Sequence, residues 1–356
     1  MILTIFSFIF VIGVLVFFHE MGHFLAAKSV GVRVEKFYLG FNFFGLGLKK
    51  MYKGTEYGIG LFPLGGYVKL AGIIDESLDT ECTGAPDEFK SKNMFQKIWI
   101  MSAGVIMNFL LAILIFAHLT YHNGIDDPDP QAIVGKVIPE YPAERLGLQE
   151  SDEILSVNGI QVADWESMTQ EIHSHPKEEI EISWIRNGEI TTARITTKST
   201  PQLLGDELVE RGMIGIMPIL NHREAGLFES FSVGYRQTYH LLNYTYRSMM
   251  ALFKGNVSIK EMAGPIMIAK IAGETASAGW GALLGLMAFI SINLGFINIL
   301  PVPGLDGGHV VIALIEGIIR RDIPLKVKMG IQQTGLVLLL LLFITIMVND
   351  IQRLFQ

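Results

Sequence analysis

Four stretches of the chain are apolar and long enough to cross a lipid bilayer. The first, Met1 to Phe18, contains no charged residue, and three further uncharged runs cover residues 98–117, 275–305 and 331–348. A helix needs roughly 20 apolar residues to span the hydrocarbon core. Because the first run has neither a basic start nor a small-residue cleavage site, it is predicted to be a membrane helix and not a cleaved signal peptide. The sequence therefore predicts a polytopic α-helical membrane protein with four transmembrane helices.

Basic residues are concentrated in two of the segments that connect these runs. The segment between the first and second runs carries ten lysines and arginines, from Lys28 to Lys97, and the short segment before the fourth run carries four more. Since basic loops stay on the cytoplasmic side, both segments are predicted to be cytoplasmic. Both chain termini and the residues from about Tyr121 to Ala278 are then predicted to lie outside.

Composition narrows the chemistry that the chain can support. Only 18% of the residues are charged and 50% are hydrophobic, whereas soluble domains carry about a quarter charged residues. The net charge of −7 gives no basic surface for nucleic acid, so no nucleic-acid partner is predicted. The single cysteine, Cys82, excludes an intramolecular disulfide and a cysteine zinc cage. Any metal site must therefore use histidines and carboxylates.

The inner end of the first run carries the sequence His19-Glu20-Met21-Gly22-His23. In this HExxH pattern two histidines share one helix face and can bind one zinc ion. His19 lies about 26 Å along a helix that begins near residue 2, within a hydrocarbon layer of roughly 30 Å. Ionisable residues at that depth are costly and typical of functional sites. His19 and His23 are therefore predicted zinc ligands, and Glu20 is the predicted general base that takes a proton from the attacking water.

A catalytic zinc site usually has three protein ligands, so one ligand remains to be found. In the segment Asn298 to Gly308, two prolines interrupt the apolar run and Asp306 follows them. A helix entering from outside near Trp280 brings Asn298 about 27 Å inward, level with His19. Asp306 is therefore the predicted third ligand. His309, three residues later on the same helix face, is an alternative on these grounds alone.

Two asparagines in the same run are candidates for binding substrate. Asn298 and Asn293 could hold the backbone of a substrate or a developing oxyanion. The alternative for each is a hydrogen bond between helices of the membrane bundle, and for Asn293 both interpretations weigh equally.

The segment Gly54 to Gly72 is rich in Tyr, Ile, Phe and Val, and Pro63 and Gly65-Gly66 are typical of a turn. It is predicted to form a β-hairpin. Its uncharged part, residues 57–68, is too short to cross the bilayer, which predicts a re-entrant or interfacial position. An edge strand beside a protease site can pair with an extended substrate. A cytosolic hairpin without substrate contact is the alternative.

The outside segment opens with a Pro-rich break at Asp126 to Pro130 and then becomes polar and strand-like. Residues 142–148 (PAERLGL) and 152–159 (DEILSVNG) resemble the signature of a PDZ domain. Such α+β domains bind extended peptides by strand addition, so a peptide or substrate segment is the expected ligand.

The aromatic-rich segment Leu227 to Phe253 favours an amphipathic helix at the membrane surface, with a core helix of the outer domain as the alternative.

The predicted organisation is, in order, a first span with HExxH (1–27), a cytoplasmic or re-entrant β-hairpin region (28–97), a second span (98–121), an inserted extracytoplasmic PDZ domain (122–222), interfacial amphipathic helices (223–278), a third span with the proline motif (279–319), a cytoplasmic loop (320–330) and a fourth span (331–349).

Taken together, these motifs resemble the bacterial site-2 proteases of the RseP type. The resemblance rests on HExxH, the segment Leu64 to Lys69 (LGGYVK), a PDZ-like domain, residues 262–266 (MAGPI) and Asn298 to Gly308, and it covers nearly the whole chain. It implies a zinc-dependent protease in the bacterial inner membrane, with its active site toward the cytoplasmic leaflet. It implies that His19, His23 and Asp306 are metal ligands and that Glu20 is the catalytic glutamate. It also implies that the hairpin clamps substrate through the segment containing Gly65, Gly66 and Tyr67. Asn298 and Asn293 are implied to contact substrate.

Family substrates are single-span membrane proteins already trimmed outside, typically anti-sigma factors, and remnant signal peptides; the resemblance implies that the PDZ domain screens out bulky substrates. Two departures are visible. The best-known members have tandem PDZ domains where this chain has one, and Val105 stands where the family's Ala-Gly-Pro-x-x-Asn motif has proline. The alternatives are a catalytically silent PDZ-containing membrane scaffold, a metalloprotease with its site in a soluble domain, and a zinc transporter.

Overall fold

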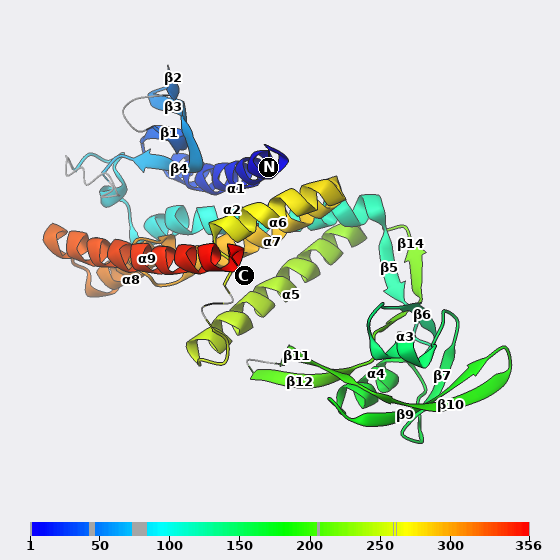
Figure 1. Ribbon diagram of the computed structural model, residues 1–356. Helices are drawn as coiled ribbons and strands as arrows, with labels where there is room; N and C mark the ends of the chain where they lie inside the picture. Colours follow the sequence, from blue (N-terminus) through cyan, green and yellow to red (C-terminus); the bar gives the residue numbers. More distant parts are fainter. Residues whose placement is uncertain are drawn as a thin grey trace. The chain divides into compact units, whose positions relative to one another are not determined.

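The computed structural model describes residues 2–42, 47–72, 84–204, 207–258, 260 and 262–355 (Figure 1). Cys82 lies outside the described residues. The chain forms two compact units. The first is a helical unit that also carries a β-sheet and is built from Met1–Leu119, Phe228–Tyr246 and Ser258–Gln356. The second is a β-rich unit built from Thr120–Leu227 and Arg247–Val257.

Four helices in the described part of the chain are long and apolar enough to cross a membrane. They are α1 (Ile2–Ser29), α2 (Met94–Asn123), α7 (Trp280–Ile299) and α9 (Leu325–Leu354). They coincide with the four apolar runs, which confirms the prediction of a multi-pass membrane protein with four candidate spans. Buried side chains of α1, α2 and α7, among them Val11, Leu15, Ala112 and Ile292, form the core of this unit. The orientation of the spans stays a prediction.

The third apolar run is divided in two. Helix α7 ends at Ile299, and α8 (Asp306–Ile319) begins only after a non-helical stretch that contains Pro301 and Pro303. Each proline lacks the N–H that would continue the helix. A Cβ on Gly307 would collide with the carbonyl oxygens of Ile299 and Leu300. Glycine at this position therefore lets the start of α8 pack against the end of α7.

Helices α5 (Leu227–Phe253) and α6 (Pro265–Ala278) precede α7 in the sequence. The segment Leu227–Phe253 is one continuous helix, as predicted, and Phe228, Tyr235 and Tyr239 are among its exposed aromatic side chains. Its position at a membrane surface stays a prediction.

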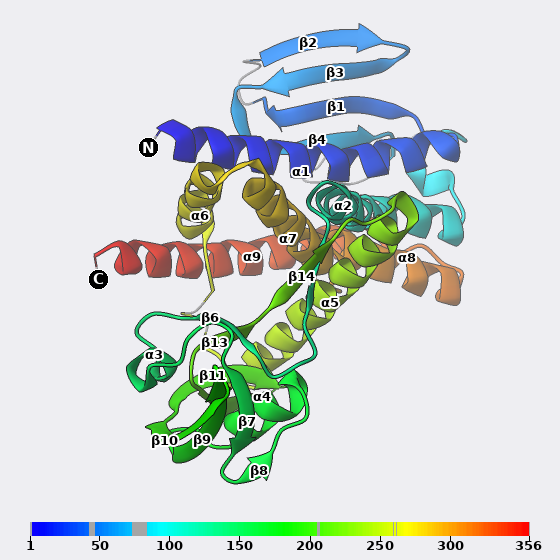
Figure 2. The ribbon, with the colours of Figure 1, turned by 90° about the vertical axis from the view of Figure 1, so that its right-hand side faces the viewer.

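The helical unit carries a four-stranded sheet made of β1 (Val34–Phe41), β2 (Gly47–Tyr52), β3 (Thr55–Gly60) and β4 (Phe62–Leu70). The strand order is β2-β3-β1-β4, so β4 is an edge strand, and it lies beside α1 (Figure 2). Strand β3 is parallel to β1 and antiparallel to β2, while β4 is antiparallel to β1.

The predicted β-hairpin over Gly54 to Gly72 is wrong. The segment does form two strands, but β1 lies between them, so β3 and β4 do not pair with each other. Gly65 and Gly66 lie inside β4 and not in a turn, and Gly66 is the register partner of Leu39. Gly-Gly is typical of a turn, but at Gly66 the missing side chain allows a close approach of β4 to β1 and α1.

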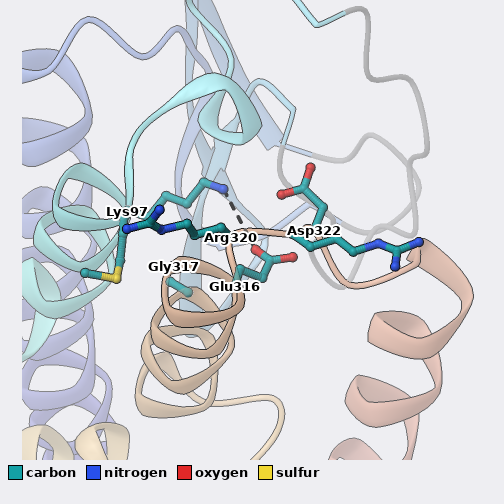
Figure 3. Close-up of a pocket in the computed structure, with 8 residues that line it drawn as sticks. Lys97, Glu316, Gly317, Arg320 and Asp322 are labelled. Atoms are coloured by element: carbon teal, nitrogen blue, oxygen red, sulfur yellow. Dashed lines mark ion pairs between the residues drawn. The ribbon is translucent and has the colours of Figure 1, made fainter.

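The far end of α8 is anchored by buried charges. Glu316, which is 7% exposed, lies 2.7 Å from Nζ of Lys328 and 3.8 Å from Nζ of Lys97, and accepts a hydrogen bond from the backbone N–H of Ile323. Glu316 and Lys97 line a pocket of about 330 Å³ together with Arg320 and other residues (Figure 3). These contacts connect α8 to the beginnings of α2 and α9.

The β-rich unit contains an antiparallel sheet in the order β10-β9-β7-β8. Its core is formed by side chains such as Ile154, Val157, Met168, Ile180 and Ile182. The elements are β5 (Ile125–Pro128), β6 (Val134–Val137), α3 (Pro142–Leu146), β7 (Glu153–Val157), β8 (Ile160–Gln161), α4 (Trp165–His173), β9 (Glu179–Arg186), β10 (Glu189–Thr196), β11 (Lys198–Leu204), β12 (Glu207–Met213), β13 (Ile216–Pro218) and β14 (Leu220–Arg223).

Strands β9 and β10 form a hairpin, because they pair antiparallel on either side of Asn187-Gly188, a dipeptide typical of a two-residue turn. Both residues have positive φ, 52° and 85°, as a two-residue hairpin turn of this kind requires.

Candidate metal centre and active site

Helix α1 places His19 and His23 one turn apart with both rings buried, 9% and 7% exposed. Their Nε2 atoms are 3.3 Å apart. Oδ2 of Asp306, the first residue of α8, lies 3.2 Å from Nε2 of His19 and 3.3 Å from Nε2 of His23. The three atoms thus form a nearly equilateral triangle, and the structure brings together the three residues predicted as metal ligands.

This triangle fits a zinc ion. Tetrahedral coordination with ligand distances of about 2.0–2.1 Å requires ligand atoms about 3.3 Å apart. Oδ2 of Asp306 is buried and has no hydrogen-bond partner in the described part of the chain, which is costly for a carboxylate oxygen unless a cation neutralises it. Within that part of the chain, these three residues are the only group of histidines, cysteines and carboxylates arranged to hold a metal. Three ligands leave the fourth position open for water.

His309, the alternative third ligand, lies outside this group. Its Nε2 is 3.4 Å from Nε2 of Gln332 in α9, on a neighbouring helix. Asp306 and His309 differ in their place on α8. Asp306 is the first residue of the helix, directly after the proline segment, whereas His309 follows three residues later.

Glu20 follows His19 in the chain but is not part of the metal triangle. Its carboxylate accepts a hydrogen bond from the backbone N–H of Val68 in the edge strand β4. A Cβ on Gly66 would lie 2.9 Å from Cγ1 of Val16 and 3.5 Å from Cγ of Glu20. The absence of a side chain at Gly66 therefore allows β4 to approach the face of α1 that carries Glu20.

The other predicted residues of this strand have local structural partners. Gly65 has a φ of 126°, a conformation that favours glycine. The ring of Tyr67 stacks on that of Tyr38 in β1, with centroids 5.2 Å apart and planes at 3°. Contact of these residues with substrate stays a prediction.

The two asparagines of α7 occupy different surroundings. Oδ1 of Asn293 accepts a hydrogen bond from the hydroxyl of Thr245 in α5 at 3.3 Å, and its Nδ2 donates to the carbonyl of Phe289 at 2.8 Å. This is the interhelical hydrogen bond that the alternative interpretation describes. Asn298 is half-buried in the last turn of α7, and its amide forms no hydrogen bond within the described residues. A substrate role for either residue stays a prediction.

Sequence reasoning missed the contribution of α2 to this site. Nδ1 of His23 is 2.8 Å from the carbonyl oxygen of Ile100, and Nδ1 of His19 is 3.1 Å from the amide of Asn108. A Cβ on Gly104 would collide with Nε2 of His23 and lie 2.7 Å from Cε1 of His19. The sequence feature that could have predicted this contact is the pair Gly104 and Asn108, one helical turn apart in an uncharged span. A buried amide in such a span needs a hydrogen-bond partner.

Two histidines of the candidate span α1 and an aspartate at the start of α8 form the residue set of an HExxH metallopeptidase site in a membrane protein. The model of Peptidase family M50 matches residues 7–342, and the chain belongs to this family. It is a membrane zinc metalloprotease of the site-2 protease type, as the sequence resemblance predicts.

Relatives match over nearly their full length. A protein of Campylobacter jejuni is 34% identical over 358 residues, covering 97% of this chain and 92% of its own length. One of Clostridium acetobutylicum is 34% identical over 340 residues, covering 95% and 94%. Both are named "putative zinc metalloprotease". The zinc metalloprotease RasP of Bacillus licheniformis is 29% identical over 429 residues, covering 99% of each chain.

A solved PDZ domain of an SdrC-like protein from Listeria monocytogenes aligns with 27% of this chain and 94% of its own, at 18% identity and a TM-score of 0.22. That score is too low to define the fold of the β-rich unit.

Proposed function

We propose that this protease cleaves the transmembrane segments of single-span membrane proteins, such as anti-sigma factors and remnant signal peptides. The observation that carries this proposal is the position of the metal triangle, because His19 and His23 lie in α1, a 28-residue candidate span. His19 is about 26 Å along that helix, within a hydrocarbon layer of roughly 30 Å. A peptide bond reaches this site only if the substrate itself is at membrane depth.

The chemistry follows from the residues around the triangle. When bound, zinc supplies a Lewis acid that polarises water and the peptide carbonyl. Glu20 takes the proton of the attacking water and passes it to the nitrogen of the leaving amine. Its hydrogen bond from Val68 N–H fixes the carboxylate against β4. The amide of Asn298, which forms no hydrogen bond in the part of the chain that the structure describes, is available to hold the substrate backbone or the developing oxyanion.

Strand β4 is the proposed binding site for the extended substrate. It has β1 on one side, and it lies beside the face of α1 that carries Glu20. An edge strand offers backbone N–H and C=O groups to a peptide, which would pair with β4 near Gly65, Gly66 and Tyr67. A membrane helix must unwind before a protease can cut it, and strand pairing stabilises the extended form. This role places the sheet in a re-entrant or interfacial position.

The β-rich unit is proposed to be a PDZ domain that screens substrates. Its sequence D-x-I-L-x-V-N-G spans β7 and the turn after it, where Asn158 and Gly159 both have positive φ. A domain of this kind binds an extended peptide by strand addition and holds back substrates whose outer part is still bulky. A catalytically silent scaffold, the alternative, would not need a carboxylate such as Glu20 beside a complete ligand triangle.

The site of cleavage tests the proposed substrate class. The purified full-length protein, reconstituted in liposomes with a single-span test protein, should release fragments whose new termini lie inside the transmembrane segment when mapped by mass spectrometry. A substrate with the same cleavage sequence in a water-soluble loop is the matched control and should stay intact. Cleavage confined to the soluble loop would contradict the proposal.

The proposed orientation places both termini and the β-rich unit outside the cytoplasm, and Cys82 in the cytoplasmic region. A membrane-impermeant maleimide should therefore label Cys82 in inverted vesicles and not in spheroplasts. Labelling from the outer face alone would reverse the orientation.

A further inference from the structure

One face of α2 contacts both zinc-ligating histidines at three successive turns. Ile100, Gly104 and Asn108 are spaced four residues apart, so they lie on the same side of the helix. The carbonyl of Ile100 is 2.8 Å from Nδ1 of His23, the space above Gly104 holds both rings, and the amide of Asn108 is 3.1 Å from Nδ1 of His19.

These contacts constrain the protonation of the two rings. The Nε2 atoms of His19 and His23 face Asp306 at 3.2 and 3.3 Å, so each ring would bind a metal through Nε2. A neutral imidazole that donates its Nε2 lone pair carries its hydrogen on Nδ1. That hydrogen needs an acceptor. His23 has one in the carbonyl of Ile100, which no side-chain substitution removes. His19 has Asn108.

The Asn108 amide is fully buried, with 0% exposure, and one of its ends has no partner within the described residues. Its Nδ2 faces His19, which suits a ring with the hydrogen on Nε2, while its Oδ1 is unpaired. Turning the amide by 180° exchanges two atoms of similar size and leaves one end unpaired in either case. The orientation of the Asn108 amide therefore depends on which nitrogen of His19 carries the hydrogen. With a metal on Nε2 the hydrogen is on Nδ1, and Oδ1 of Asn108 must face it.

We propose that Asn108 is a positioning residue that holds His19 in its zinc-binding tautomer, with its Oδ1 accepting the hydrogen bond from Nδ1–H. The helix turn that carries it is fixed from behind, because the hydroxyl of the fully buried Ser291 in α7 donates to the carbonyl oxygen of Asn108 at 2.8 Å. A hydrogen-bond acceptor behind a histidine ligand fixes the ring and raises its basicity, and its loss typically costs 10- to 100-fold in metal affinity.

This inference rests on the zinc site and not on the nature of the substrate, so its test measures zinc binding in the absence of substrate. The full-length protein in detergent is titrated with zinc in competition with a chelator, and circular dichroism checks that each variant retains its helices. Asn108→Leu keeps the volume and removes the acceptor, and is expected to weaken zinc binding about 10- to 100-fold. Asn108→Asp restores an acceptor and is expected to bind zinc at least as tightly as the unsubstituted protein.

Ser291→Ala is the matched control. It removes the hydrogen bond to the backbone of Asn108 but leaves the amide facing His19, and is expected to weaken zinc binding by less than about threefold. If Asn108→Leu does not fold, Asn108→Ala replaces it in the comparison with Asn108→Asp.

Three results would overturn the proposal: unchanged zinc affinity in a folded Asn108→Leu or Asn108→Ala protein, an Asn108→Asp protein as weak as these, or an equal loss in Ser291→Ala. The last result would assign the effect to the packing of α2 on α7. Absence of cleavage within a transmembrane segment would count against the proposed function alone, because zinc affinity is measured separately.

Discussion

Oδ2 of Asp306 lies 3.2 Å from Nε2 of His19, although α1 and α8 are far apart in the sequence. The contact depends on the proline segment between α7 and α8, because that break starts a new helix at Asp306. It also depends on Gly307, where a Cβ would collide with carbonyl oxygens at the end of α7. The position of the predicted third ligand is thus set by the way α7 ends and α8 begins.

Asp306→Ala should lose bound zinc and all proteolytic activity, since it removes one of three ligands. His309→Ala, three residues later in α8, is the matched variant and should keep zinc with at most a moderate loss of rate, because His309 lies beside Gln332 of α9. Metal content of both purified proteins, measured by mass spectrometry, checks this. Zinc retained without Asp306 but lost without His309 would reverse the assignment.

Glu20→Gln should abolish cleavage of a transmembrane substrate while leaving about one zinc ion per chain, since a general base and not a ligand is removed. The amide still accepts the hydrogen bond from Val68 N–H but cannot take a proton. Zinc content and single-turnover cleavage of the same preparation are compared. Proteolysis by a clean Glu20→Gln preparation would refute the mechanism.

The sequence predicts these ligands because each is marked by a pattern within a few neighbouring residues. HExxH places two histidines on one helix face by spacing alone, and the prolines before Asp306 mark a new helix start. The order of the sheet is not local, since β3 pairs in parallel with β1 and separates two strands that are neighbours in sequence. The partners of Asn108 and Asn293 are likewise on other helices, His19 in α1 and Thr245 in α5. A pattern along one segment cannot identify such partners.

Gly66→Ala should slow cleavage while zinc stays bound. A Cβ at Gly66 would lie 2.7 Å from the carbonyl oxygen of Tyr38 in β1 and 2.9 Å from Cγ1 of Val16 in α1, so β4 must shift relative to both elements. The hydrogen bond that holds Glu20 shifts with it, and a displacement of about 1 Å near a catalytic group can cost about 100-fold in rate. The measured quantity is kcat on a transmembrane substrate.

Gly13→Ala is the control for this substitution, because Gly13 lies in α1, the helix that carries Glu20, and a Cβ there meets nothing within 4 Å. It should leave kcat unchanged and slightly favour the helix. Equal rates for the two variants would show that β4 does not position Glu20.

Glu316→Gln should destabilise the helical unit by about 3 kcal/mol, as expected when one partner of a buried ion pair is removed. The glutamine keeps an acceptor for Ile323 N–H but leaves Lys97 and Lys328, which lie 3.8 and 2.7 Å from the carboxylate, without a counter-charge. Lys97 is only 8% exposed, so its ammonium group would lose its counter-charge while largely buried.

The exposed pair Lys270–Glu274 in α6 provides the comparison for that loss, since its charges are 4.0 Å apart and both side chains are more than half exposed. Glu274→Gln should change stability by less than about 0.5 kcal/mol. Thermal unfolding of the zinc-loaded proteins in the same detergent measures both. Adding Lys97→Met to Glu316→Gln should recover part of the lost stability, because it removes a buried charge that no longer has a partner. Equal losses from the buried and exposed glutamates would mean that the ion pairs do not anchor α8, and that its position depends on apolar packing alone.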